Sequence, residues 1–161
     1  MDRVRGLFSL VLITACVMGV LRVAHVSIPM VFPETRQGPI DVASLDEVRR
    51  LAGFAPLLPA YRPALLGEQP SSMTFTYHPQ PTVVTVWRAG SQYLSVTQQK
   101  GGPMPDHPPL AQPLAAVPGS RWWSNGDRSQ VILGRGAFWI LIDTSLPARE
   151  LTRFVDTLTP Y

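Results

Sequence analysis

The feature that most constrains this chain is a long apolar run near its N-terminus, LFSLVLITACVMGVLRVAHV, at Leu7–Val26. A helix rises about 1.5 Å per residue, so roughly 20 residues cross a hydrocarbon core of about 30 Å. No charge occurs from Leu7 to Leu21, and Arg22 and His25 lie at the far end, where a long cation reaches the headgroups. Leu7–Val26 is therefore predicted to form a transmembrane helix, within an N-terminal membrane anchor or signal segment of residues 1–26.

The charges beside this run predict its orientation. Arg3 and Arg5 flank the near end, which places the short N-terminus in the cytoplasm by the positive-inside rule, and Arg22 weakens that bias without reversing it. We therefore expect a single-pass protein of the bacterial cytoplasmic membrane, with its C-terminal domain outside the cytoplasm.

Two alternatives use the same residues. The tetrapeptide Ile13-Thr14-Ala15-Cys16 resembles a lipobox, in which Cys16 would be lipidated, although Val17–Leu21 keeps the run apolar beyond it. A cleaved signal peptide is the other alternative, but no A-x-A-like site follows the run cleanly. All three interpretations export the chain from about residue 30 onward, as an anchored, lipidated or secreted domain.

The composition of the exported part argues against nucleic-acid binding. Of 14 Lys and Arg residues three lie in the first 26 positions, and of 11 Asp and Glu residues one does, which leaves 11 against 10. The sequence pI near 9.5 thus reflects the flanks of the apolar run. Cys16 is the single cysteine, so no intrachain disulfide can form. About 130 residues suffice for one domain with one core.

Residues 27–43 are predicted to be a tether, because prolines and glycine interrupt any helix there. Ser44-Leu45-Asp46-Glu47 then matches a capping box, in which the Ser hydroxyl and the Glu carboxylate each accept an amide hydrogen bond. With Gly53 as the C-terminal cap, residues 44–52 are predicted to be a short amphipathic helix. This helix begins the extracytoplasmic domain, residues 44–161.

The segment Phe54–Pro63 is apolar and rich in proline, so it is predicted to run extended along the edge of a sheet. From Ser71 the period changes to two, and tight turns separate short β-branched and aromatic runs, which is typical of an antiparallel meander. The predicted strands are 71–77, 83–87, 93–97, 114–117, 121–124, 129–133 and 137–143. Turns are expected at 78–81, 88–91, 125–127 and 134–136, and Lys100–Pro113 is expected to be a surface loop.

A second amphipathic helix is predicted over Pro147–Leu158, with Pro147 in its first turn and Thr144 or Ser145 as the cap. The expected fold class is therefore α+β. An N-terminal transmembrane helix is followed by a curved antiparallel sheet of about six or seven strands, with the two amphipathic helices packed on one face.

The Phe54–Pro63 segment, the meander and the run WWSNGDRSQVILGRGAFWILIDTSLPARELTRFVDTL together resemble an uncharacterised extracytoplasmic bacterial domain. That domain often follows the membrane span of anti-sigma factors, and its plan is similar to the half-barrels of lipoprotein carriers and periplasmic sigma-factor regulators. The resemblance covers Leu45–Tyr161 and implies a sensing or binding module with no catalytic residues to carry over. Because only Met1–Gly6 precede the run, we do not expect this chain to grip a sigma factor itself.

The titratable residues do not suggest catalysis. The three histidines His25, His78 and His107 lack the ligand spacing of a metal site, and no sequence motif for a cofactor occurs. Asp106-His107 with a serine such as Ser120 would suit a hydrolase, but there is no G-x-S-x-G elbow. We expect a protein that is not an enzyme, with the hydrolase as the least favoured alternative.

The aromatic residues give the best indication of binding. Adjacent strand residues point to opposite faces, so Trp122 and Trp123 cannot both enter one core. The residues that could line an apolar concavity for an acyl chain or a peptide are Trp87, Tyr93, Trp122, Trp123 and Trp139. The alternative is that they pack as ordinary core and sheet-edge residues.

Two functions follow as hypotheses. The first is a membrane-tethered extracytoplasmic binding or sensory module that engages an envelope protein or a lipid. The second is a structural envelope component that acts through self-association or through its Pro-rich loop.

Overall fold

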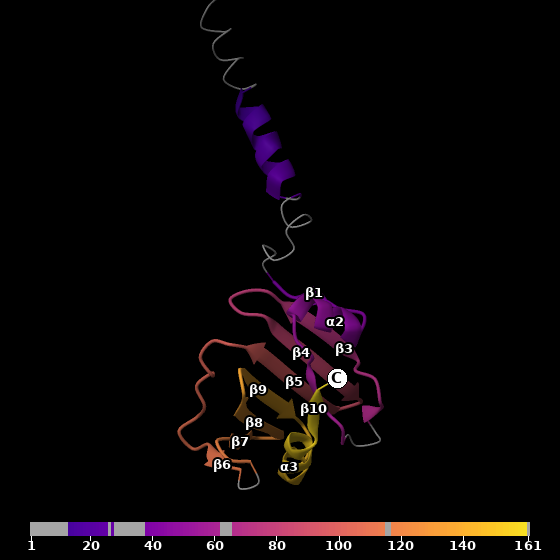
Figure 1. Cartoon of the computed structure of the whole chain (residues 1–161), viewed down its shortest axis with the longest axis vertical. Coiled ribbons are helices and arrows are strands. Elements are labelled where there is room, and N and C mark those ends of the chain that lie inside the picture. The colour runs from indigo at the N-terminus through magenta and orange to yellow at the C-terminus, as the bar shows by residue number, and fades with distance from the viewer. Residues whose placement is uncertain (1–12, 26, 28–37, 62–65, 115–116, 161) are drawn as a thin grey trace, which may run out of the picture. The chain divides into compact units, whose positions relative to one another are not determined.

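The computed structural model describes residues 13–25, 27, 38–61, 66–114 and 117–160, and the chain divides into two compact units, Met1–Gln37 and Gly38–Tyr161 (Figure 1). In the first unit, residues 13–25 are helical. No helix within the described ranges is long and apolar enough to cross a membrane. Of the predicted span, residues 7–12 and 26 lie outside the described residues, as do 28–37 of the predicted tether.

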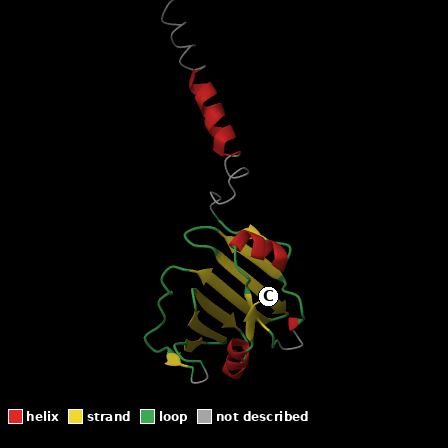
Figure 2. Cartoon of the chain, in the orientation of Figure 1, coloured by secondary structure: helices red, strands yellow, loops and turns green. Residues whose placement is uncertain are grey.

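The second unit has the α+β organisation that the sequence predicts. Its elements in chain order are β1 (Ile40–Asp41), α2 (Leu45–Ala52), β2 (Leu57–Pro59), β3 (Ser72–Thr76), β4 (Thr82–Ala89), β5 (Gln92–Lys100), β6 (Gln112–Pro113), β7 (Arg121–Asn125), β8 (Arg128–Arg135), β9 (Phe138–Thr144), α3 (Ala148–Asp156) and β10 (Leu158–Pro160). The main antiparallel sheet has eight strands, against six or seven expected (Figure 2).

The main sheet is built from two meanders, an arrangement that the sequence pattern does not specify. The order is β1-β3-β4-β5-β9-β8-β7-β6, so β3–β5 form one meander and β6–β9 form a second that returns in the opposite direction to pair β9 with β5. The chain therefore passes from β5 to the far edge before it starts the second meander. The Pro-rich segment between Lys100 and Gln112 makes this passage, which spans four strand spacings or about 19 Å.

Both helices of this unit cover the same face of the sheet. Val83 packs with Val48 of α2 in one buried cluster, and Trp87 packs with Phe154 of α3 in another. Val83 and Trp87 are four residues apart on β4, so their side chains lie on one face. In Figure 2 the two helices lie on the same side of the strands. The hydrophobic core thus lies between this face and the helices.

The segment Phe54–Pro63 contains an extended strand, β2, as predicted. This strand belongs to a second sheet and not to an edge of the main one. β2 pairs with β10 in an antiparallel two-stranded sheet. Gln98 of β5, which is fully buried, joins this small sheet to the main one: its Nε2 donates to the carbonyl of Leu57 at 2.7 Å, and its Oε1 accepts from the Leu57 N–H at 2.6 Å. Residues 62 and 63 of the predicted segment lie outside the described ranges.

The first helix is capped as the sequence predicts. The Ser44 hydroxyl accepts from the N–H of Glu47 at 3.2 Å, and Gly53 closes the helix in the left-handed region at φ 68°. The Glu47 carboxylate accepts from Ala43, one residue before the expected amide. The capping box therefore provides hydrogen-bond acceptors for one backbone amide before the N-cap residue Ser44 and for one after it.

The predicted caps of the second helix are wrong. Pro147 occupies the N-cap position and makes no side-chain cap bond. The Thr144 and Ser145 hydroxyls instead bind the backbone of Tyr93 on β5, at 2.7 Å to its carbonyl and 2.9 Å from its N–H. These hydroxyls extend the pairing of β9 with β5 beyond the last strand residue. Leu158, assigned to the helix by periodicity, begins β10.

Several strand boundaries also differ from prediction. The turn expected at 88–91 is at Gly90 and Ser91, because Arg88 and Ala89 still pair with β5 as part of β4. Leu114 and Val117 of the predicted strand 114–117 are not in a strand, residues 115–116 lie outside the described ranges, and the pairing falls on β6 instead. The turn expected at 134–136 is at Gly136 and Ala137, because Gly134 and Arg135 belong to β8 and still pair with β9.

Candidate functional site

The main sheet has a second face that neither α2 nor α3 covers. We call it the helix-free face, and it carries the alternate residues of the four central strands. These include Val84, Val86 and Arg88 of β4, Tyr93, Ser95 and Thr97 of β5, Arg128, Gln130 and Ile132 of β8, and Trp139, Leu141 and Asp143 of β9. Most of them are half-buried, but Ile132 is only 1% exposed.

Part of the Pro-rich segment between Lys100 and Gln112 reaches this face. Gly134 shares the side of Ile132 on β8, and Met104 Cε lies 3.9 Å from where a Cβ on Gly134 would be. The Pro-rich segment thus contacts the helix-free face near the C-terminal end of β8. The N-terminal end of β8, with the adjoining ends of β4, β5 and β9, is a different part of this face.

The five aromatic residues predicted to bind a ligand are divided between the two faces. Trp87 is fully buried in the core, and Trp122 packs against the same cluster. Tyr93, Trp123 and Trp139 lie on the helix-free face. The opposite directions of Trp122 and Trp123 follow the strand alternation that the sequence predicts. One concavity lined by all five residues is excluded, because Trp87 has no exposed surface.

Among the three on the helix-free face, Tyr93 lines a hollow. Trp139 is half-buried, and its indole Nε1 is enclosed without a hydrogen-bond partner among the described residues. Trp123 is also half-buried, on β7 near the sheet edge. The aromatic prediction therefore identifies one residue of the hollow and four that lie elsewhere.

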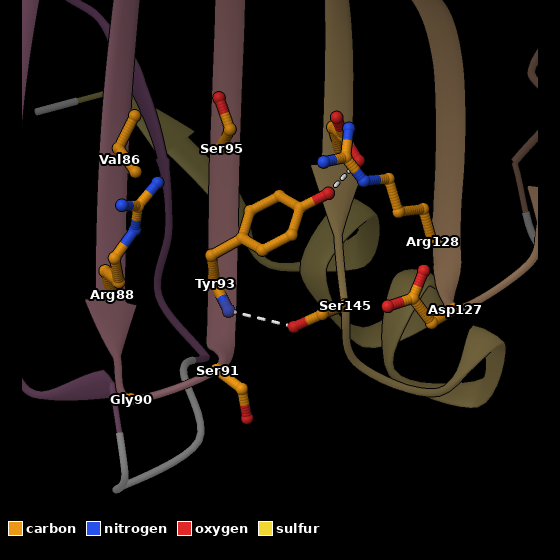
Figure 3. A pocket seen from close by; sticks show the side chains of 10 residues that line it. Val86, Arg88, Gly90, Ser91, Tyr93, Ser95, Asp127, Arg128 and Ser145 are labelled. Atoms are coloured by element: carbon orange, nitrogen blue, oxygen red, sulfur yellow. Dashed lines mark hydrogen bonds between the residues drawn. The ribbon is translucent and has the colours of Figure 1, made fainter.

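The hollow has a volume of about 510 Å³ and lies on the helix-free face where β4 and β9 end and β5 and β8 begin (Figure 3). Its lining residues are Val86, Arg88, Gly90, Ser91, Tyr93, Ser95, Asp127, Arg128, Asp143 and Ser145. Charged groups and hydroxyls dominate this set. The lining therefore differs from the apolar concavity for which the aromatic residues were candidates.

Tyr93 is fixed at the centre of the hollow by contacts along its whole length. Its backbone N–H donates to the Ser145 hydroxyl at 2.9 Å, and its phenol O–H donates to Asp143 Oδ1 at 2.7 Å. The Arg128 guanidinium carbon lies 5.6 Å from the ring centroid, within cation–π range. Figure 3 shows the ring between Arg88 on one side and Arg128 on the other.

These contacts keep the phenol protonated. The pKa of Tyr93 is raised from 10.0 to about 12, and burial is the largest cause. The hydrogen bond to Asp143, the charge of that carboxylate and the charge of Asp127 contribute to the rise, whereas the charge of Arg128 opposes it. At neutral pH Tyr93 is therefore a neutral donor that orients Asp143.

The two arginines of the hollow retain free hydrogen-bonding capacity. Within the described part of the chain, neither Arg88 nor Arg128 has a carboxylate within salt-bridge distance. Each guanidinium presents a planar fork of N–H donors that matches a carboxylate or a phosphate. Against these two positive charges stand two negative ones, Asp127 and Asp143.

Sequence reasoning missed the charged residues of this hollow, although one signal was present. In the strand FWILIDT, Asp143 alternates out of phase with Ile140 and Ile142, so it had to face away from the core. Asp127 lies in a turn, and Arg88 and Arg128 lie on strands close to turns, where charges are ordinary. Their convergence depends on the strand order, which the sequence did not reveal.

The residues of the hydrolase alternative do not form a site. Asp106 and His107 are exposed on the Pro-rich segment, and the His107 Nδ1 lies 3.2 Å from the Pro108 carbonyl oxygen. Ser120 is fully buried, and its hydroxyl donates to the Val117 carbonyl at 2.7 Å. A buried hydroxyl cannot attack a substrate beside exposed Asp106 and His107.

The other residues considered in the sequence analysis do not form a second site among the described residues. No group of three His, Cys, Asp or Glu side chains within the described ranges could hold a metal ion. Cys16, the candidate lipidation site, is exposed on the helix of residues 13–25. No family model, curated protein or solved structure matches the chain.

Proposed function

We propose that this chain is a membrane-tethered extracytoplasmic binding or sensory module without catalytic activity, and that it recognises its ligand with the helix-free face. The observation that carries the proposal is the hollow on that face. Tyr93 is fixed there by named hydrogen bonds, beside two arginines that have no carboxylate partner in the described part of the chain. A surface that is ordered and still offers free donors is suited to binding.

The membrane location rests on the sequence of the N-terminal segment. The charge-free run from Leu7 to Leu21, with Arg3 and Arg5 before it, favours an anchor whose C-terminal domain is exported. Lipidation at Cys16 and cleavage of the segment remain the alternatives. The resemblance to domains that follow the span of anti-sigma factors supports the same location and a sensory role.

The chemistry of the hollow favours a polar ligand over an acyl chain. Of its lining residues, Val86 and Tyr93 alone carry apolar bodies. A partner that presents charged or hydrogen-bonding groups, such as an envelope protein or a lipid headgroup, would be complementary.

Site-specific photocrosslinking in the native host tests the binding role. A photoreactive phenylalanine analogue at Thr97 on the helix-free face is compared with one at Arg49, an exposed residue of α2. We expect a discrete crosslinked product from position 97 and none from position 49. Equal crosslinking at both positions, or none at either, would contradict recognition by the helix-free face.

Two measurements test the location. Mass spectrometry of the mature N-terminus separates an intact anchor from a diacylglyceryl Cys16 or a cleaved segment. An alkaline phosphatase fusion at the C-terminus is expected to be active, since that enzyme folds outside the cytoplasm. An inactive fusion that accumulates to normal levels would contradict export.

One observation favours a second candidate, a structural role through self-association. The Pro-rich segment exposes two large apolar side chains, Leu110 at 88% and Met104 at 44%. Exposed apolar residues on one segment suit contact with a second copy. Light scattering of the full-length chain and of Leu110→Ser tests this: a dimer that dissociates on substitution favours the structural role, and a monomer in both excludes it.

A further inference from the structure

We infer that the hollow binds a small zwitterion, in which an oxyanion (phosphate or carboxylate) is joined to an ammonium group. The inference rests on the proposed binding role and names the ligand chemistry of the same site. It follows from how the charges are distributed across the hollow.

The side of the hollow on β4 is positive. Arg88 is exposed there and lies directly opposite Tyr93 in the strand register. Figure 3 shows its guanidinium directed along the strand toward Val86 and Ser95. No other charged residue of the lining belongs to β4 or β5. An oxyanion placed here can accept a bidentate pair of N–H bonds from Arg88, with the Ser95 hydroxyl nearby.

The side on β8 and β9 is negative by one charge. Asp127 and Asp143 lie there with Arg128, whose guanidinium is held over the Tyr93 ring. Asp143 Oδ1 is occupied by the Tyr93 hydroxyl, which leaves its second oxygen as an acceptor. An ammonium group has three donors and no acceptor, so it suits carboxylate oxygens.

Neither charge alone fits the hollow as well as both together. A lone anion would approach two carboxylates, and a lone cation would approach two guanidiniums. The lining carries two charges of each sign, so a zwitterion leaves the occupied site neutral. Two strand spacings, about 10 Å, separate β4 from β9, and the side chains of Arg88 and Asp143 fill part of that distance. Two ligand charges a few bonds apart can span what remains.

Calorimetric titration of the full-length chain in a nonionic detergent tests the inference. The probes are O-phosphoethanolamine and 4-aminobutyrate as zwitterions, with inorganic phosphate and ethanolamine as single-charge references. We expect at least one zwitterion to bind ten-fold or more tightly than either reference. Phosphate binding as tight as the zwitterions, or no binding by any probe, would overturn the inference.

Three variants locate the binding. Arg88→Gln is expected to weaken zwitterion binding at least ten-fold. Asp127→Asn is expected to weaken it as well while leaving phosphate binding unchanged or stronger. The control Arg49→Gln removes an exposed arginine of α2 that has no salt bridge among the described residues, and it is expected to change nothing. Circular dichroism confirms that each variant folds, and zwitterion binding unaffected by folded Arg88→Gln would overturn the inference.

The zwitterion could come from a lipid headgroup or from a soluble compound. Hydrogen exchange over residues 88–95 is compared between nanodiscs of phosphatidylethanolamine and of phosphatidylglycerol, each with and without soluble O-phosphoethanolamine. Slowing by phosphatidylethanolamine identifies the lipid source, and slowing by the soluble probe alone identifies the free compound. Equal slowing by phosphatidylglycerol would overturn the inference. Crosslinking at Thr97 without any zwitterion binding would leave the proposed function intact and reject this ligand alone.

Discussion

Replacing Gln98 by leucine should destabilise the second unit substantially, because one buried amide joins the two sheets. Leucine keeps most of the side-chain volume, so the change removes two hydrogen bonds to Leu57 and creates little cavity. The backbone N–H and carbonyl of Leu57 would then lack the partner that the Gln98 amide provides. Pro160, paired with Leu57 in the small sheet, has no N–H with which to replace the lost donor.

The expected magnitude follows from these two groups. Leaving a buried backbone donor or acceptor unpaired costs about 1–3 kcal/mol. Leu57 is half-buried, so water recovers part of that cost, and we expect a total of about 2–4 kcal/mol in the free energy of unfolding. A loss of this size is a large fraction of the roughly 5–15 kcal/mol that holds a domain folded.

Urea denaturation followed by tryptophan fluorescence measures this difference. The matched control is Gln130→Leu, on the half-buried helix-free face, where we expect a change within about 0.5 kcal/mol. A loss below about 1 kcal/mol for Gln98→Leu, or equal losses for both variants, would show that Gln98 does not hold the sheets together.

Three further predictions concern single residues. Ser44→Ala removes the acceptor of the Glu47 N–H and should lower the free energy of unfolding by about 1 kcal/mol, measured by urea denaturation. Gly53→Ala meets no atom within 4 Å but places a Cβ at φ 68°, so a loss of about 1 kcal/mol is expected from backbone strain alone. The raised pKa of Tyr93 means that the folded state binds its proton more tightly than the unfolded state does. The resulting stability should be complete below pH 10 and lost as pH rises toward about 12, so the stability difference between the native chain and Tyr93→Phe should shrink over that range; a constant difference would refute it.

Features that depend on neighbouring residues were predictable from the sequence. The Ser44 cap and Gly53 act within one short helix, and both are confirmed. The opposite directions of Trp122 and Trp123 follow from strand geometry alone. In each case the physical cause lies within a few residues, so the local sequence is sufficient to predict the feature.

Features that depend on distant pairing were not predictable. The hydroxyls of Thr144 and Ser145 are chemically suited to cap a helix, but β5 lies beside them and binds them instead. The contact between Tyr93 and Asp143 joins residues fifty positions apart. It exists because the second meander returns to β5, and no local pattern records that return. The hollow depends on the same pairing.

Cysteine labelling in intact spheroplasts tests the central claim most directly. Thr97→Cys and Arg49→Cys are made in a Cys16→Ser background, treated with a membrane-impermeant maleimide, and normalised to labelling of the purified chains. An extracytoplasmic module that binds its ligand with the helix-free face predicts full labelling at position 49 and protection at position 97. No labelling at either position, or equal labelling at both, would contradict the claim.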